Sequence, residues 1–282
     1  MTWDTTQLIW TPVGQPAITL ATGSHLANGT LNPYRLINLD GLGPSPAKYV
    51  SIKTPGKRGV THLDVKVDHR VISATFLIQG VDGNDLWVKR ATFAASTAQV
   101  PLAALASLVE GTIKLVRGGG LADLQLSGGV THLSMPMTSK QSAGVIVCDI
   151  EWECGDPWWT PTSDTTTSVP TASTPVNCQN TGDGVAYVKY VIGPMTNPII
   201  TNVTTGAVFK INATIAVGHT LTVYAGPTIT ILYDGTVNWA KYLDHTSRYV
   251  TPLAVGANSI QWSGSSATGA LSVVYRPAVR GA

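Results

Sequence analysis

The sequence predicts a mainly β protein made of two modules, and three observations favour this fold class. Short segments alternate apolar and polar residues with a period of two, which is typical of strands with one wet face. Threonine, a strand-favouring residue, occurs 36 times among 282 residues, and glycine and asparagine recur where turns are needed. Charged residues make up only 12% of the chain, but apolar residues make up 44%, so the low charge does not indicate disorder.

The first segments are extended and rich in turns. Residues 31–39 are followed by 40–44, where glycine and proline prevent a helix. Residues 50–52 form a short apolar stretch that leads into a glycine-bounded basic loop. The basic side chains of this loop are Lys53, Lys57 and Arg58.

Two strands and two helices are expected next. Alternation over 63–68 predicts a strand with one wet face, and the apolar run 71–78 predicts a buried strand. Asn84 or Asp85 can cap a helix that extends to Thr97, because this stretch lacks glycine and proline. A second helix is predicted to begin near Pro101 and to end at Gly111.

Strands resume after these helices. Residues 113–116 predict one strand, and 124–126 and 130–133 flank Gly128-Gly129, which predicts a tight hairpin. From Ile146 to Trp152 apolar residues alternate cleanly with polar and acidic ones, which indicates a strand with a buried and a wet face.

The domain junction is expected in a stretch rich in threonine, serine and proline. We predict an N-terminal domain over residues 1–159, a connection over 160–184 that can itself pair as an edge strand, and a C-terminal domain over 185–282. The C-terminal domain carries strand signals every roughly 8 to 12 residues, which is typical of a sandwich or jelly roll. Asp234-Gly235 predicts a hairpin turn within it.

Composition and spacing give little support to an enzyme or a metal site. The net charge of +2 is too small for a dedicated nucleic-acid binder. None of the six histidines has the spacing of a zinc motif, and Cys148, Cys154 and Cys178 are expected to be buried, inert thiols. We therefore expect no catalytic residue, no cofactor and no metal.

Three carboxylates could suggest a glycosidase. Asp149, Glu151 and Glu153 share one face of a predicted strand, where alternate residues lie about 6.5 Å apart. The wet outer face of a sheet explains them better.

No apolar run is long enough to cross a membrane, and Met1 to Asp4 lack the features of a signal peptide, so we expect folding in the cytoplasm and no membrane insertion.

Several motifs resemble one known family. Asp156-Pro157-Trp158-Trp159 stands at the end of the N-terminal domain, and Leu39-Asp40-Gly41 near its start. The C-terminal domain carries Thr196-Asn197-Pro198, Ile200-Thr201-Asn202, Thr204-Thr205-Gly206, Thr236 to Trp239, Ser247-Arg248-Tyr249 and Ala257-Asn258-Ser259-Ile260. In these motifs the chain resembles the distal tail proteins of long-tailed bacteriophages.

The resemblance implies a fold and a role. It implies an N-terminal β-sandwich or split-barrel-like ring domain with one or two helices and hairpins, followed by a galectin-like β-sandwich. Such proteins form a ring, typically six-fold, at the distal end of the tail in the virion. The ring joins the tail tube protein to the tail hub of the baseplate or tail tip, and the tape measure protein and later the DNA pass through it. The resemblance also implies synthesis in the host bacterial cytoplasm.

Two surface features leave alternatives open. The basic loop with Lys53, Lys57 and Arg58 either lines the ring's channel or is a solvated hairpin tip. Trp239 and Tyr242 are the exposed aromatic patch that we expect, and they could stack on a sugar or pack on the domain core. The alternative functions are therefore a carbohydrate-binding module that attaches the tail tip to the host cell wall, and an accessory domain of a wall-degrading enzyme.

Overall fold

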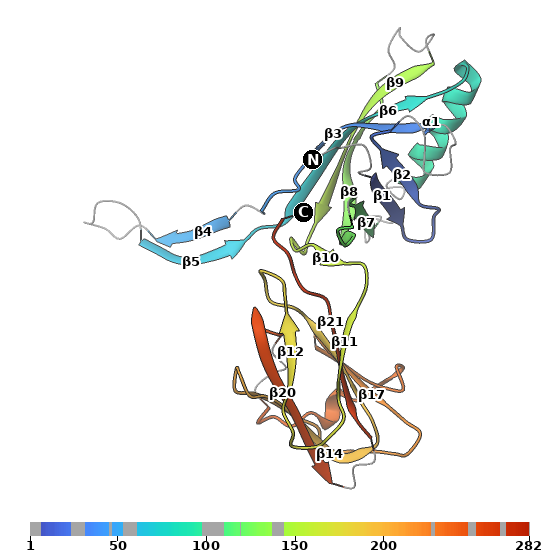
Figure 1. The fold of residues 1–282 in the computed structure, drawn as a ribbon. Coiled ribbons are helices and arrows are strands. Elements are labelled where there is room, and N and C mark those ends of the chain that lie inside the picture. Colours follow the sequence, from blue (N-terminus) through green and yellow to red (C-terminus); the bar gives the residue numbers. More distant parts are fainter. Residues whose placement is uncertain are drawn as a thin grey trace. The chain divides into compact units, whose positions relative to one another are not determined.

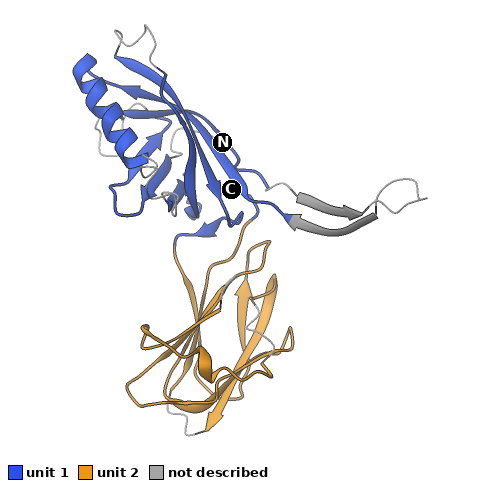
Figure 2. Ribbon diagram, turned by 180° about the vertical axis from the view of Figure 1, so that it is seen from behind, with its two compact units in different colours: residues 1–162, 280–282 blue, residues 163–279 orange. Residues whose placement is uncertain are grey.

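The computed structural model describes residues 7–23, 32–44, 47–52, 61–97, 110–118, 120–136, 144–226, 229–247, 252–265 and 269–281, with the backbone alone for 47–52 and 61–66. The chain forms two compact units (Figure 2). Unit 1 contains Met1–Thr162 and Arg280–Ala282, and unit 2 contains Ser163–Val279. The chain thus leaves unit 1 after Thr162 and returns to it at Arg280.

Unit 1 contains a closed barrel of seven strands (Figure 1). Its strands are β1 (Gln7–Pro12), β2 (Ile18–Ala21), β3 (Tyr34–Asp40), β6 (Arg70–Gln79), β7 (Glu110–Val116), β8 (Leu124–Ser134) and β9 (Val145–Cys154). The strands pair in the order β8-β7-β1-β2-β3-β6-β9, and β9 pairs back with β8. This closure corrects the predicted sandwich or split barrel, because a sheet that pairs with itself has no free edge.

Two smaller elements of strand accompany the barrel. The short strand β10 (Thr160–Pro161) extends the sheet by pairing with β8. The strands β4 (Ala47–Ile52) and β5 (Thr61–Val67) pair antiparallel with each other as a two-stranded ribbon. The basic side chains predicted to lie in a loop, Lys53, Lys57 and Arg58, are outside the described residues.

Alternating side chains fill the barrel interior. Ile72, Phe76 and Ile78 of β6 are fully buried, whereas Val71 on the opposite face is 43% exposed. The predicted strand at 71–78 is therefore confirmed, but only one of its faces is fully buried. On β9 the predicted alternation is confirmed, since Trp152 is buried and its indole ring lies 6.0 Å from that of Trp10 on β1.

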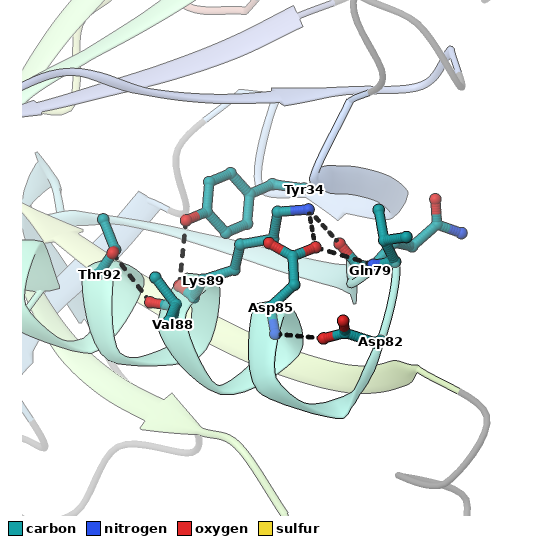
Figure 3. A network of polar contacts seen from close by, with 8 residues as sticks. Tyr34, Gln79, Asp82, Asp85, Val88, Lys89 and Thr92 are labelled. Carbon is teal, nitrogen blue, oxygen red and sulfur yellow. Dashed lines mark hydrogen bonds and ion pairs between the residues drawn. The ribbon is translucent and has the colours of Figure 1, made fainter.

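The first predicted helix is confirmed as α1 (Gly83–Thr97), but its cap lies earlier than we predicted. The Asp82 carboxylate accepts a hydrogen bond from the Asp85 backbone N–H at 2.8 Å (Figure 3). The Asp85 carboxylate in turn accepts from the Val81 N–H and from Lys89 Nζ. This reciprocal arrangement satisfies two backbone donors at the helix start. The second predicted helix, from Pro101, lies outside the described residues as far as residue 109, but its predicted end at Gly111 is wrong, because Glu110 and Gly111 pair within the strand β7.

The interior face of α1 packs on the barrel. Phe93 is buried, and its ring centroid lies 4.6 Å from that of Phe76 and 5.3 Å from that of Tyr34. The Tyr34 hydroxyl donates to the Lys89 carbonyl at 3.1 Å (Figure 3). The helix is therefore fixed to β3 and β6 by an aromatic contact and a polar one.

The hairpin predicted at Gly128-Gly129 is wrong, because β8 runs straight through both glycines. Gly129 pairs with Glu110 of β7 on one side and with Glu153 of β9 on the other, so it lies where the barrel closes. A Cβ at Gly128 would come within 2.7 Å of Cys154 Sγ. The glycines serve close strand packing here and not a turn.

Unit 2 consists of two antiparallel sheets. The first contains, in order, β11 (Thr165–Val169), β21 (Leu271–Tyr275), β13 (Val188–Ile192), β17 (Leu221–Ala225), β18 (Ile229–Tyr233) and β19 (Val237–Asn238). The second contains β12 (Val176–Asn180), β20 (Gly256–Ser265), β14 (Met195–Asn202) and β15 (Ala207–Lys210), with β16 (Thr214–Ile215) on β14. The short 3₁₀ helix η4 (Ala240–Tyr242) follows β19.

One apolar core is shared by both sheets of unit 2. Leu221, Val223 and Val273 of the first sheet and Phe209 and Trp262 of the second are buried in the same cluster, which makes the unit a β-sandwich. Two strands from the predicted connection 160–184, β11 and β12, belong to these sheets. The galectin-like character of the unit, and the division into domains at 159 and 185, stay predictions.

The hairpin predicted at Asp234-Gly235 is confirmed. Both residues have positive φ, at 48° and 71°, and the turn joins Tyr233 to Val237 in the β18–β19 pairing. A turn with two positive φ angles suits the twist of antiparallel strands, and aspartate and glycine tolerate it. This local sequence therefore determines its own conformation.

Candidate functional site

A buried arginine organises one end of the barrel in unit 1. Arg70 is the first residue of β6 and is only 2% exposed. Its Nε donates to the Pro157 carbonyl at 2.8 Å, and its Nη2 donates to the Arg280 carbonyl at 2.5 Å. Its Nη1 donates to the carbonyls of Gly41, at 2.6 Å, and Gly43. The planar guanidinium thus gathers four carbonyls, a geometry that a lysine ammonium cannot reproduce.

Aromatic rings complete this group, which we call the Arg70 junction and define by Arg70, Gly41, Gly43, Pro157 to Trp159 and Arg280. The Arg70 guanidinium lies 5.8 Å from the centre of the fully buried Trp159 ring, and the Arg280 guanidinium lies 5.4 Å from that of Trp158. Burial lowers the pKa of Arg70 from its ordinary value, because the charged form loses water. The four carbonyl dipoles and the rings offset part of that cost.

The two N-terminal motifs that carry the resemblance meet at this junction. Gly41 has a φ of +87°, and a Cβ there would lie 2.1 Å from the Val71 carbonyl oxygen, so this position requires glycine. Asp156 accepts a hydrogen bond from the Trp158 N–H at 3.1 Å, which turns the chain toward Trp159. Sequence reasoning found both motifs but missed Arg70, whose one local signal is a basic residue at the start of an apolar strand.

A second group of interest is an aromatic cluster in unit 2, formed by His219, Tyr233, Trp239 and Tyr242. Tyr233 stacks on Trp239 with centroids 4.1 Å apart and on His219 at 5.2 Å, and Tyr242 meets Trp239 edge-on at 4.9 Å. Tyr233, Trp239 and Tyr242 are half-buried and pack on the sandwich core. Glycan binding at Trp239 and Tyr242 stays a prediction.

Polar contacts hold the ends of the cluster. His219 Nδ1 lies 2.5 Å from Asp234 Oδ2, and the Asp234 carboxylate also accepts the Thr220 N–H at 3.0 Å. These bonds, that of Thr220 first, lower the pKa of Asp234. Lys241 Nζ lies 4.9 Å from the centre of the Tyr242 ring. Most of these groups are thus already engaged with one another.

Buried asparagines explain two of the C-terminal motifs. Asn202 Nδ2 donates to Asn258 Oδ1 at 3.2 Å, and Asn202 Oδ1 accepts from the Thr204 and Thr205 N–H groups. Asn258 Nδ2 donates to the carbonyls of Ala254 and Gly256. The motif residues therefore hold turns of the sandwich and are not arranged to bind a ligand.

The remaining candidate residues lie apart from these groups. Asp149, Glu151 and Glu153 are exposed on the outer face of β9, as expected, and Thr75 donates to Asp149 at 2.7 Å. All three cysteines are buried, and burial raises the pKa of Cys148 to about 12 and that of Cys154 to about 11. Among the described residues no group of three or more histidine, cysteine or acidic side chains is placed to hold a metal ion. A search of the same residues finds no helix with the length and apolar character of a membrane span.

The fold matches a solved phage protein over nearly its full length. The crystal structure of Dit (gp 19.1) from phage SPP1, described as a paradigm of the hub adsorption apparatus in phages that infect Gram-positive bacteria, superposes with a TM-score of 0.69. The match covers 97% of this chain and 98% of SPP1 Dit, at 13% sequence identity. The chain has the fold of SPP1 Dit. The predicted resemblance to distal tail proteins is therefore confirmed at the level of the fold.

Two further structures match over similar lengths. Chains of the phage P2 baseplate in its activated conformation superpose with a TM-score of 0.53 for the structure with Ca and 0.50 for that with Sr. Their sequence identities are 10% and 8%, and the matches cover 96% and 95% of this chain and 98% and 97% of theirs. No family model and no curated protein sequence matches the chain significantly.

Proposed function

We propose that this protein is a structural component of a phage virion, a distal tail protein that forms a ring at the end of the tail. The observation that carries the proposal is the likeness to SPP1 Dit over both units and nearly the whole of both chains. The motif resemblance, which comes from the sequence and not from the fold, supports the same role. The protein acts by geometry in this proposal and catalyses no reaction.

The proposed ring places the protein between known kinds of tail component. It joins the tail tube protein to the hub of the baseplate or tail tip, and it surrounds the channel through which the tape measure protein and the DNA pass. We propose six copies, the symmetry that the resemblance implies. Lys53, Lys57 and Arg58 then line the channel, with contacts to phosphate weak enough for DNA to slide.

Two features of unit 1 support assembly with further copies. The β4–β5 ribbon pairs with no other strand of the described chain, and an isolated two-stranded ribbon is only marginally stable in water. The outer face of α1 carries Trp87, which is 47% exposed, and Val88, which is 57% exposed, beside the exposed Ala91. Large exposed apolar side chains favour a protein contact, and the Arg90 guanidinium lies 4.9 Å from the centre of the Trp87 ring.

The test is the oligomeric state of the purified chain. Mass photometry should show particles of six times the 29.6 kDa mass of one chain, and negative-stain images should show rings with an open centre. If the ring closes only on its tail partner, the same particles should form when the tail tube or hub protein is added. A chain that stays monomeric with both partners present contradicts the proposal.

A matched pair of variants tests the outer face of α1. Trp87→Glu should prevent ring formation, because it places a charge in the centre of the proposed contact. Tyr224→Glu changes an aromatic residue of similar exposure, 41%, in unit 2 and should leave the rings intact. Equal loss of rings in both variants would show that a general solubility effect is responsible.

A further inference from the structure

The Arg70 junction brings together segments that are distant in the sequence. Gly41 and Gly43 lie between β3 and β4, Pro157 follows β9, and Arg280 comes after all of unit 2. Gly281 lies beside the same loop as Gly43, since a Cβ added to it would meet the Leu42 carbonyl oxygen at 3.5 Å. A side chain of β6 thus contacts the segment that leads out of unit 1 and the one that leads back.

We propose that Arg280 and Gly281 form a closing segment that completes unit 1 through the Arg280 carbonyl. A buried guanidinium requires acceptors for its N–H groups, and the Arg280 carbonyl is the acceptor of Nη2. Until the closing segment docks, the Nη2 group of Arg70 lacks this acceptor. Unit 1 therefore depends for its full stability on residues that follow unit 2 in the sequence.

The proposal separates the backbone of Arg280 from its side chain. The carbonyl bonds Arg70, whereas the guanidinium stacks over Trp158. Arg280→Ala keeps the carbonyl and removes the stacking over Trp158, so it should have a small effect. Deletion of residues 280–282 removes both. Arg70→Lys keeps the buried charge but loses the fork that reaches four carbonyls.

Hydrogen exchange measured by mass spectrometry on the full chain can distinguish these cases locally. In the deletion variant and in Arg70→Lys, exchange over residues 39–44 and 158–162 should accelerate by about 5- to 100-fold, as expected when a buried polar group loses its partner. Arg280→Ala should stay within about threefold of the wild type. Exchange in unit 2 serves as the internal reference and should not change.

Arg117→Lys is the matched control for the arginine substitution. Arg117 also donates to a backbone carbonyl, that of Ala122, but it is on the surface. The Arg117→Lys substitution should leave hydrogen exchange over residues 39–44 and 158–162 unaltered. Unchanged exchange in the deletion variant overturns the proposal, and so does an Arg280→Ala effect as large as that of the deletion, because the side chain and not the carbonyl would then close unit 1.

Trypsin supplies a second test, in which the wild type is compared with Arg70→Lys. The bond between Arg280 and Gly281 should resist cleavage in the wild type, because the Arg280 carbonyl and side chain are both held. Arg276 precedes proline, so trypsin does not cut there, and a species that lacks only residues 281–282 in an intact-mass spectrum reports cleavage after Arg280. We expect rapid loss in Arg70→Lys. Equally rapid loss from the wild type would disprove docking of the segment.

Discussion

Both units hold irregular loops next to a β core, but they use different polar side chains to do so. Unit 1 uses one buried cation, Arg70, whose acceptors lie between 27 and 210 residues away in the sequence. Unit 2 uses neutral asparagines, and most bonds of Asn258 reach residues two to four positions away. In unit 1 the single side chain of Arg70 joins several loops that are distant in the sequence, beside the more local bonds of the buried Asn32. In unit 2 several asparagines share this role, and Asn180 reaches the carbonyls of Leu253 and Ala254.

The largest expected effect is at Arg70. Arg70→Met removes the buried cation that donates to four carbonyls, and we expect a loss of about 3–5 kcal/mol from the free energy of unfolding of unit 1. Urea titration followed by hydrogen exchange in unit 1 measures it. Arg117→Met, on the surface, should cost less than about 1 kcal/mol. Similar losses in both variants would break the comparison, because they would show that Arg70 is not a concentrated contact.

The next effect is at Asn258. Asn258→Ala removes donors to Ala254 and Gly256 and the acceptor of Asn202, and we expect unit 2 to lose about 2–4 kcal/mol. If the contacts are distributed, Asn202→Ala should lose about 1–3 kcal/mol, and the double variant should lose less than the sum of the two. Strict additivity would argue against a shared network.

A smaller effect is expected at the start of α1. Asp82→Ala removes the carboxylate that accepts the Asp85 N–H, and it should cost about 0.5–2 kcal/mol. Asp82→Asn keeps an acceptor oxygen and should lower the stability by only a few tenths of a kcal/mol. Guanidinium denaturation of the two variants checks the order, and equal losses in both would mean that the negative charge matters more than the hydrogen bond.

The smallest effect concerns an exposed turn of unit 2 and is read from its pH dependence. Hydrogen bonds from the Thr246 hydroxyl and N–H, and then from Asn212, lower the pKa of Asp244 to about 2. Because the folded pKa is below the unfolded one, the carboxylate stabilises the fold above pH 3.8, and this contribution is lost as the pH falls toward 2. The stability difference between wild type and Asp244→Ala should therefore shrink between pH 4 and pH 2. A constant difference down to pH 2 would show that Asp244 acts without its charge.

Local patterns predicted much of the fold because the information for them is local. The alternation on β9, the helix that ends at Thr97 and the turn at Asp234-Gly235 all follow from adjacent residues. The glycine pair at 128–129 misled us because the same residues that permit a tight turn also permit close strand packing. Which role they take depends on Cys154, which lies on another strand.

The sequence by itself determined the strand-rich class, the helix and the tight turn, since each arises from propensity and periodicity over a few residues. The motifs around Gly41 and Trp159 were found through their resemblance to one family. Only the tertiary structure decided that the first sheet closes into a barrel and that Arg70 joins both motifs to Arg280. The physical reason is that a buried cation takes whatever acceptors the fold brings within about 3 Å, and a separation of 210 residues leaves no trace in the local pattern.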